Sequence, residues 1–150
     1  CASPTYLRRW GVPRAPADLL RHRIGWYSGY PTRERVVFHG PDVPPESLEL
    51  KPTLLSNSVH LLREYAQEHA GIVCLPTLVA SPAVIAGDLV LVLPKHQLSS
   101  FWLSVFYPQA ARSSLKLKLF LESLVRSFAG APPWDSALID AGLLPEGLVE

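Results

Sequence analysis

The chain has 150 residues, 48% of them hydrophobic, which is enough to bury one sizeable core. Its 14 Lys and Arg residues nearly balance 13 Asp and Glu residues, and the formal net charge of +1 gives no overall field that would hold a nucleic-acid backbone or an anionic membrane. No apolar run approaches the ~20 residues of a membrane span, so we expect a soluble globular protein.

The chain contains no methionine and begins at Cys1 in the middle of a local pattern, so we expect upstream residues that complete a larger domain. Cys1 and Cys74 are too few for a disulfide scaffold and lack metal-ligand spacing, which favours reduced thiols in a cytoplasm. The apolar run around Cys74 is typical of a small buried side chain. Cys1 is open to two interpretations: an N-terminal nucleophile with its own amine as base, or a strand end that enters a helix at Ser3-Pro4.

The first elements are short helices marked by proline and glycine. Ser3 as N-cap, a following proline and Gly11 just past the end predict a helix over residues 4–10. The side chains that this helix would bury are Tyr6, Leu7 and Trp10. A second helical turn is expected over residues 16–20.

Strands and turns follow. Residues 24–27 predict a strand, residues 28–31 a turn and residues 33–38 a second strand. The proline-rich residues 39–52 predict a connection, which ends in a further strand over residues 48–55.

The next segment has the helix and strand succession of an α/β protein. Capping side chains at residues 56–58 precede a helix whose apolar positions share one face, namely Val59, Leu62, Tyr65, Ala66 and His69. Residues 72–75 predict a central strand of a parallel sheet. Residues 81–86 repeat the cap, proline and glycine pattern of a helix, and residues 89–93 predict a second such strand. We therefore expect α/β units joined by short connections.

Residues 101–107 predict an aromatic strand, and Ser113 or Ser114 caps an amphipathic helix. The apolar stripe of that helix comprises Leu117, Phe120, Leu121, Leu124, Val125 and Phe128. Such a stripe needs a partner surface, which we expect to come from residues upstream of Cys1 or from another copy of the chain. Residues 129–150 form a tail with a second possible short helix over residues 136–141.

Short motifs follow one another along the chain: Ala2-Ser3-Pro4-Thr5-Tyr6-Leu7 with Gly11-Val12-Pro13, Pro16-Ala17-Asp18-Leu19 with His22, Ala70-Gly71-Ile72-Val73-Cys74-Leu75-Pro76, Gly87-Asp88-Leu89-Val90, and Tyr107-Pro108 before the final helix. In this order and spacing they resemble the effector-binding domain of LysR-type transcriptional regulators, over about residues 1–128. In one departure His69 replaces the first glycine of the family's Gly-x-Gly-Ile, which leaves a tight helix-to-strand approach in question.

The resemblance implies an α/β fold like that of periplasmic binding proteins, with two subdomains joined by crossing strands and an effector in the cleft between them. It assigns residues 1–95 to the second, effector-binding subdomain and residues 96–128 to the C-terminal part of the first. Residues 129–150 remain a tail.

The candidate effector-binding residues are Ser28, Gly29 and Tyr30, then Ser56, Asn57 and Ser58, then Pro76 and Thr77. They follow predicted strands or begin helices, where unpaired N–H groups and the helix dipole favour a small carboxylate. Ordinary capping or a plain turn explains the same residue types equally well, and capping does not exclude ligand contact.

The resemblance implies a non-enzymatic, cytoplasmic, ligand-sensing domain with no cofactor. Its partners would be a small organic acid or related metabolite, other copies of itself, and DNA only through an N-terminal domain absent from this chain; no membrane is expected. The alternative is a stand-alone solute-binding protein of similar fold. The histidines, which are His22, His39, His60, His69 and His96, match no metal motif.

Overall fold

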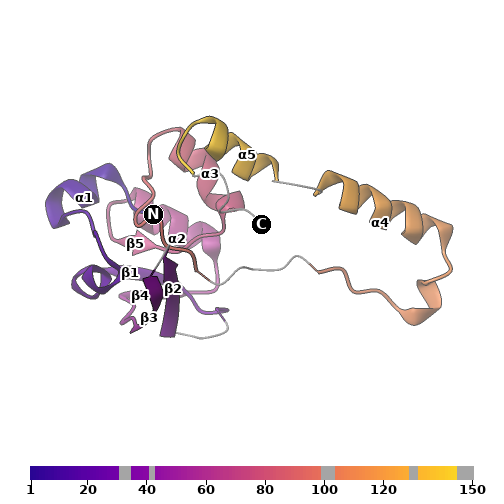
Figure 1. The fold of residues 1–150 in the computed structure, drawn as a ribbon, viewed down its shortest axis with the longest axis horizontal. Coiled ribbons are helices and arrows are strands. Elements are labelled where there is room, and N and C mark those ends of the chain that lie inside the picture. Colours follow the sequence, from indigo (N-terminus) through magenta and orange to yellow (C-terminus); the bar gives the residue numbers. More distant parts are fainter. Residues whose placement is uncertain (31–34, 41–42, 99–103, 129–131, 145–150) are drawn as a thin grey trace.

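Three short parallel strands form the centre of the fold (Figure 1). Strand β1 (Ile24–Tyr27) lies between β4 (Leu54–Ser56) and β5 (Ile72–Val73). The structure is a computed structural model and describes residues 1–30, 35–40, 43–98, 104–128 and 132–144. The strand at residues 24–27 and the parallel arrangement are confirmed.

The predicted strand over residues 72–75 is shorter than expected, because β5 covers only its first two residues. On one side β5 pairs with β1, and on the other Val73 exchanges two backbone hydrogen bonds with Cys1, of 2.8 and 2.9 Å. Cys1 is therefore a strand end that leads into a helix, as the second interpretation of this residue predicted.

The predicted strand over residues 89–93 is wrong. Only Val90 pairs, through an isolated antiparallel bridge to Ala2. The physical reason lies at Leu93, whose φ of 54° is left-handed and incompatible with an extended strand.

A two-stranded antiparallel hairpin stands where a connection was expected. Strand β2 (Arg35–Gly40) matches the predicted strand at residues 33–38, of which residues 33 and 34 lie outside the described part. Strand β3 (Val43–Glu49) occupies much of the proline-rich connection, so that prediction is wrong. Its prolines are tolerated because β3 pairs on one side only among the described strands. The strand predicted over residues 48–55 divides between β3 and β4.

The first helices match their caps. Helix α1 (Pro4–Trp10) begins at Ser3, whose hydroxyl accepts a hydrogen bond from the Tyr6 N–H at 3.2 Å, and Gly11 ends it with φ +89°. The 3-10 helix η1 (Pro16–Arg21) follows. The predicted burial of Trp10 is wrong: as the last residue of a short helix, it is 47% exposed and stacks on the Tyr6 ring.

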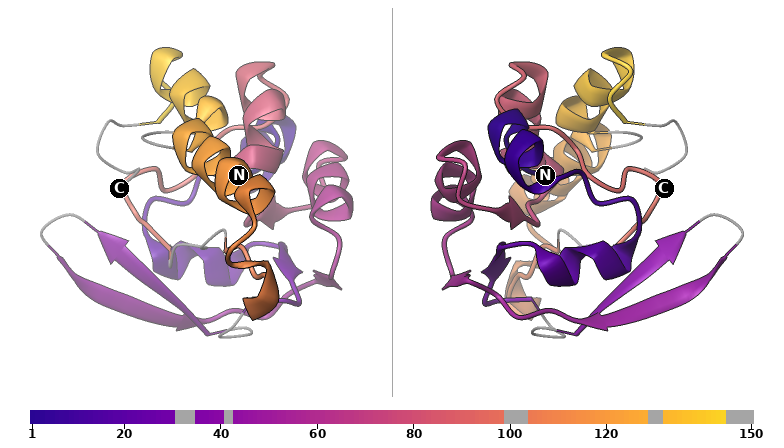
Figure 2. Two further views of the ribbon diagram at one scale, coloured as in Figure 1. Left: turned by 90° about the vertical axis from the view of Figure 1, so that its right-hand side faces the viewer. Right: turned by 90° about the vertical axis from the view of Figure 1, so that its left-hand side faces the viewer.

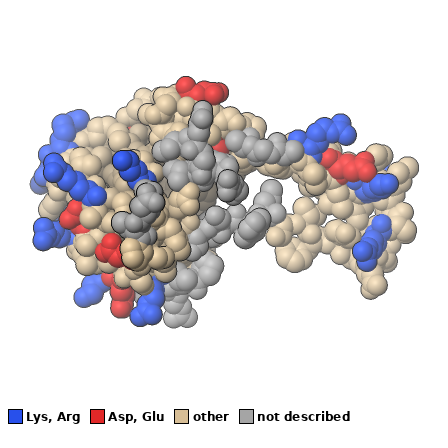
Figure 3. All heavy atoms as spheres, viewed as in Figure 1, with Lys and Arg blue, Asp and Glu red and all other residues tan. Residues whose placement is uncertain are grey.

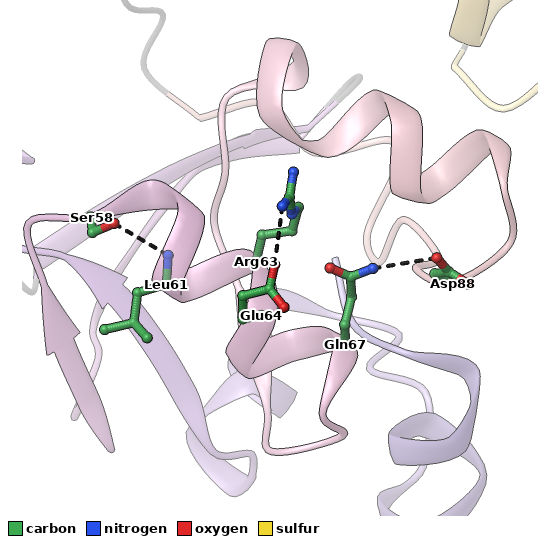
Figure 4. A network of polar contacts seen from close by, with 6 residues as sticks. All are labelled: Ser58, Leu61, Arg63, Glu64, Gln67 and Asp88. Carbon is green, nitrogen blue, oxygen red and sulfur yellow. Dashed lines mark hydrogen bonds and ion pairs between the residues drawn. The ribbon is translucent and has the colours of Figure 1, made fainter.

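Helix α2 (Val59–Gln67) forms where it was expected and buries Leu62 and Ala66 completely. The prediction that His69 shares its apolar face is wrong, because the helix ends before His69, which is left-handed and exposed. Helix α3 (Thr77–Ile85) begins four residues before the predicted cap at Ser81, so Pro82 lies inside the helix at the cost of one backbone hydrogen bond. Figure 4 shows the polar contacts of α2, among them the hydrogen bond from Gln67 to Asp88 at 3.3 Å, which joins α2 to the loop after α3.

Residues 104–128 form an arm that carries η2 (Gln109–Ala111) and α4 (Leu115–Ser127) and extends away from the body (Figure 1). Helix α4 matches the predicted amphipathic helix, and none of its residues is buried. In the strand predicted over residues 101–107, residues 101–103 lie outside the described part and residues 104–107 are not extended into a strand. No helix among the described residues is long and apolar enough to cross a membrane.

Helix α5 (Pro133–Asp140) brings the tail back to the body, where it packs beside α3. Figure 2 shows α3 and α5 together on one side of the body and the β2–β3 hairpin on the opposite side. Leu138 of α5 is fully buried. The segment predicted as a tail therefore contributes a buried side chain to the core, which the sequence patterns did not predict.

Alternation along the strands divides the interior into two clusters. Ile24, Trp26 and Ile72 face α1, η1 and the hairpin, whereas Val73 faces α2, α3 and α5. Gly25 also lies on the α2 side, where a Cβ atom would come within 2.9 Å of the Val73 side chain and 3.1 Å of the Tyr65 ring. A glycine is needed there because α2 approaches the sheet so closely.

Candidate functional site

Two of the three predicted effector-binding segments are joined directly at one edge of the sheet. Strands β1 and β4 run parallel with Tyr27 opposite Ser56, so the loops that follow them leave the same edge. The Ser28 N–H donates a hydrogen bond to the Ser56 carbonyl oxygen at 2.9 Å. The third segment, Pro76-Thr77, follows β5, the other neighbour of β1.

The first loop is a tight turn whose side chains point in different directions. The Tyr30 N–H donates to the Tyr27 carbonyl oxygen at 3.1 Å, and a Cβ atom at Gly29 would lie 2.5 Å from the Tyr27 ring. Tyr30 is buried against Trp26, with ring centroids 5.1 Å apart. Among the described residues of this loop, 28–30, Ser28 and Gly29 are exposed to solvent.

The second segment caps α2. The Ser56 hydroxyl accepts from the Ser58 N–H at 3.0 Å. The Ser58 hydroxyl accepts from the Leu61 N–H at 3.3 Å, as Figure 4 shows. Asn57 lies between them with its side chain exposed. Ser58 is therefore the N-cap of α2, Ser56 closes the turn before it, and Asn57 is exposed to solvent.

Two helix N-termini begin beside this edge. Helix α2 starts after β4, and α3 starts at Thr77 with Pro76 as N-cap. The first N–H groups of each helix have no partner within the helix and carry partial positive charge. None of the eight predicted residues is itself charged, so an anion at this edge would be held by N–H groups, hydroxyls and the Asn57 amide.

A cavity of about 150 Å³ lies beside β5, next to the sheet edge. Its lining includes Cys74 and Thr77 after β5, together with residues 91–93 and His96. Sequence patterns did not find it, because its walls come from segments far apart in the chain. Of the predicted effector-binding residues, only Thr77 lines it.

A larger hollow of about 500 Å³ lies between α4 and the segment before it. Charged side chains line much of it, including Arg112, Lys118, Glu122 and Arg126. Lys118 and Glu122 form a solvated pair at 4.0 Å. Figure 3 shows basic and acidic side chains mixed on this arm and on the body. We regard the hollow as the open side of an uncovered helix and not as a ligand site.

The departure at His69 preserves the backbone geometry. His69 has a φ of 61°, a left-handed conformation that glycine adopts most easily, and its Nδ1 lies 2.8 Å from the Ser3 hydroxyl. At Gly71 a Cβ atom would lie 2.5 Å from the Arg23 carbonyl oxygen. The tight approach of helix and strand is therefore kept. Within the described residues, no three His, Cys, Asp or Glu side chains gather as metal ligands.

Known proteins match this architecture. The model of the LysR substrate binding domain matches residues 1–129. The HTH-type transcriptional regulator YhjC of Escherichia coli K12 is 31% identical over 125 residues, covering 83% of this chain and 42% of that protein. The transcriptional activator AaeR of the same organism is 27% identical over 128 residues, covering 85% and 41%. The chain thus spans well under half the length of these relatives.

Among solved structures, the regulatory domain of CrgA, a LysR-type transcriptional regulator from Neisseria meningitidis, aligns with a TM-score of 0.64 and 21% identity. The alignment covers 84% of this chain and 61% of that one. This likeness confirms the predicted α/β fold, in the form resembling periplasmic binding proteins. The family model, which matches residues 1–129, shows that the chain belongs to the LysR substrate-binding domain family.

Proposed function

We propose that this chain is the ligand-sensing part of a LysR-type transcriptional regulator and that it binds a small-molecule effector at the carboxyl edge of the β4-β1-β5 sheet. One observation carries the proposal: in a chain of this family, exposed loops and the N-termini of α2 and α3 follow neighbouring parallel strands. Such an edge suits a small organic acid, since backbone N–H groups and helix dipoles favour an anion.

In the longer protein, the effector would bind one arrangement of the subdomains better than another and so shift the shape of a homo-oligomer. DNA contact would come from an N-terminal domain outside this chain, and the protein would act in the cytoplasm without a cofactor or catalytic activity. Relatives named as HTH-type regulators favour this function over a stand-alone solute-binding protein.

A panel of small mono- and dicarboxylates, screened by thermal unfolding, tests the proposal. At least one should stabilise the chain by about 2.7 kcal/mol when present at a hundred times its dissociation constant. Calorimetry with that acid should then show that Asn57→Ala weakens binding, while the free energy of unfolding changes little because Asn57 is exposed.

Ser58→Ala tests whether Ser58 contacts the effector as well as capping α2. Loss of the cap alone should lower the free energy of unfolding by about 1 kcal/mol. Loss of a ligand contact should in addition weaken the affinity for the acid. Glu68, exposed just past the opposite end of α2, supplies the control Glu68→Gln. Unchanged affinity in both Asn57→Ala and Ser58→Ala would place the effector elsewhere.

A further inference from the structure

The cavity beside β5 is lined by both halves of the core. Ile24 and Trp26 reach it from one face of the sheet, whereas Ala80 of α3 and Leu138 of α5 reach it from the other. Residues 91–98 also contribute to its wall, and His39 and Gln97 exchange two backbone hydrogen bonds that hold this segment against β2. The cavity is thus part of the folded body and separate from the arm that carries α4.

The lining excludes a charged occupant. Aliphatic and aromatic side chains make up most of it, and among the described residues no Lys, Arg, Asp or Glu side chain contributes. A carboxylate or ammonium group inside would lose its hydration without gaining a counter-charge. An apolar space of this volume is large enough for a molecule of about the size of benzene. The chemistry of the wall therefore selects a small, uncharged and mostly apolar ligand.

His96 adds to this mostly apolar lining a ring nitrogen that has no hydrogen-bond partner among the described residues. This nitrogen is Nδ1, and it is buried. A neutral imidazole nitrogen either donates or accepts a hydrogen bond, depending on the tautomer. A hydroxyl group on a ligand can do both, so it would satisfy Nδ1 in either tautomer.

We propose that this cavity binds a small uncharged aromatic molecule with one hydroxyl group, of the phenol class. The ring packs among Trp26, Ile72 and Leu138, and the hydroxyl pairs with Nδ1 of His96. This site is distinct from the sheet edge proposed for an organic acid, because Ser28, Asn57 and Ser58 do not line it. The inference stands whether or not an acid binds at that edge.

Phenol and benzene are the probes, and calorimetry follows their binding to the purified chain. Phenol should bind about fivefold or more tightly than benzene, the ratio expected for one hydrogen bond to a buried group. His96→Leu should abolish this preference while benzene still binds. His60→Leu is the matched control, because His60 is exposed on α2 and does not line the cavity.

The second part of the experiment fills the cavity with a larger side chain. Ala80→Leu should weaken both ligands at least tenfold, whereas Ala86→Leu, at the exposed end of α3, should leave both unchanged. If circular dichroism shows that Ala80→Leu fails to fold, Thr77→Leu fills the same cavity.

Failure of both probes to bind the folded chain at millimolar concentration would overturn the proposal, as would a phenol preference that survives in His96→Leu. Asn57→Ala should not alter phenol binding, which separates this result from the fate of the acid site.

Discussion

At Gly71 a Cβ atom would lie 2.5 Å from a backbone oxygen and 2.7 Å from the Tyr65 ring. Gly87 presents the opposite case, because its φ is +81° and nothing lies within 4 Å of its would-be Cβ. The first glycine is required by space and the second by backbone conformation. Substitution by asparagine separates these two reasons for glycine, because asparagine tolerates the left-handed conformation but needs room for its side chain.

We therefore expect Gly71→Asn to lower the free energy of unfolding by about 2–3 kcal/mol, as overpacking against a backbone atom does. Gly87→Asn should cost about 1 kcal/mol or less. Urea titrations of the two variants measure the difference. Equal losses would mean that α2 and β5 can move apart at little cost.

His22 links stability to pH. Its Nδ1 lies 3.2 Å from the Tyr6 hydroxyl, and burial lowers the pKa of His22 below its ordinary value of 6.5, against a weaker opposing effect of Asp18. As the pH falls through 6.5, the unfolded chain takes up a proton before the folded chain does. The chain should therefore lose stability below pH 6.5.

His22→Gln should flatten this part of the pH profile, and His60→Gln should leave it unchanged because His60 is exposed. Thermal unfolding between pH 5 and pH 8 provides the comparison. A slope that persists in His22→Gln would assign the effect to another group.

At the scale of elements, α5 contributes a buried side chain to a core that the preceding elements do not close. Leu138 is fully buried and reaches the cavity beside β5. Leu138→Ala should lower the free energy of unfolding by about 2–5 kcal/mol, the usual cost of a large-to-small change in a core. Leu143→Ala is the control, since that side chain is 40% exposed and should cost under about 1 kcal/mol. A small effect at Leu138 would show that α5 docks only loosely.

Local signals predicted the elements whose ends depend on neighbouring residues. Ser3, Pro4 and Gly11 define α1, and Ser58 defines the start of α2, because caps act within one turn. Strand β3 was missed because its prolines are acceptable only in a strand paired on one side, which depends on long-range pairing. The packing of α5 on α3 has no local signal.

In the candidate site, too, some features could be predicted from the sequence and others depend on long-range packing. The order of parallel strands accounts for the shared edge of Ser28 and Ser56, which follows from α/β patterning. Burial of the Tyr30 ring and the cavity around His96 arise from packing between distant segments, so no spacing in the sequence reveals them.

At the scale of the whole molecule, α4 leaves an apolar surface uncovered. Phe120 is 56% exposed and Val125 70% exposed, and no residue of the helix is buried. Exposed apolar surface costs roughly 25 cal/mol per Å² relative to burial, so several large side chains represent several kcal/mol. This favours burial against another copy of the chain.

Sedimentation velocity should therefore show self-association of the purified chain at micromolar concentration. Phe120→Glu combined with Val125→Glu should shift it toward the monomer without unfolding the body, whereas Ser127→Glu on the same helix should have little effect. A strictly monomeric wild-type chain would mean that α4 tolerates its exposure.

The return of α5 to α3 also has a consequence for synthesis. The face of α3 that receives Leu138 emerges from the ribosome well before α5 does. At about 5–20 residues per second, that interval lasts several seconds, during which the nascent chain presents an incomplete core. Chaperones that recognise apolar segments would have this window to bind, and it would close when the tail helix docks.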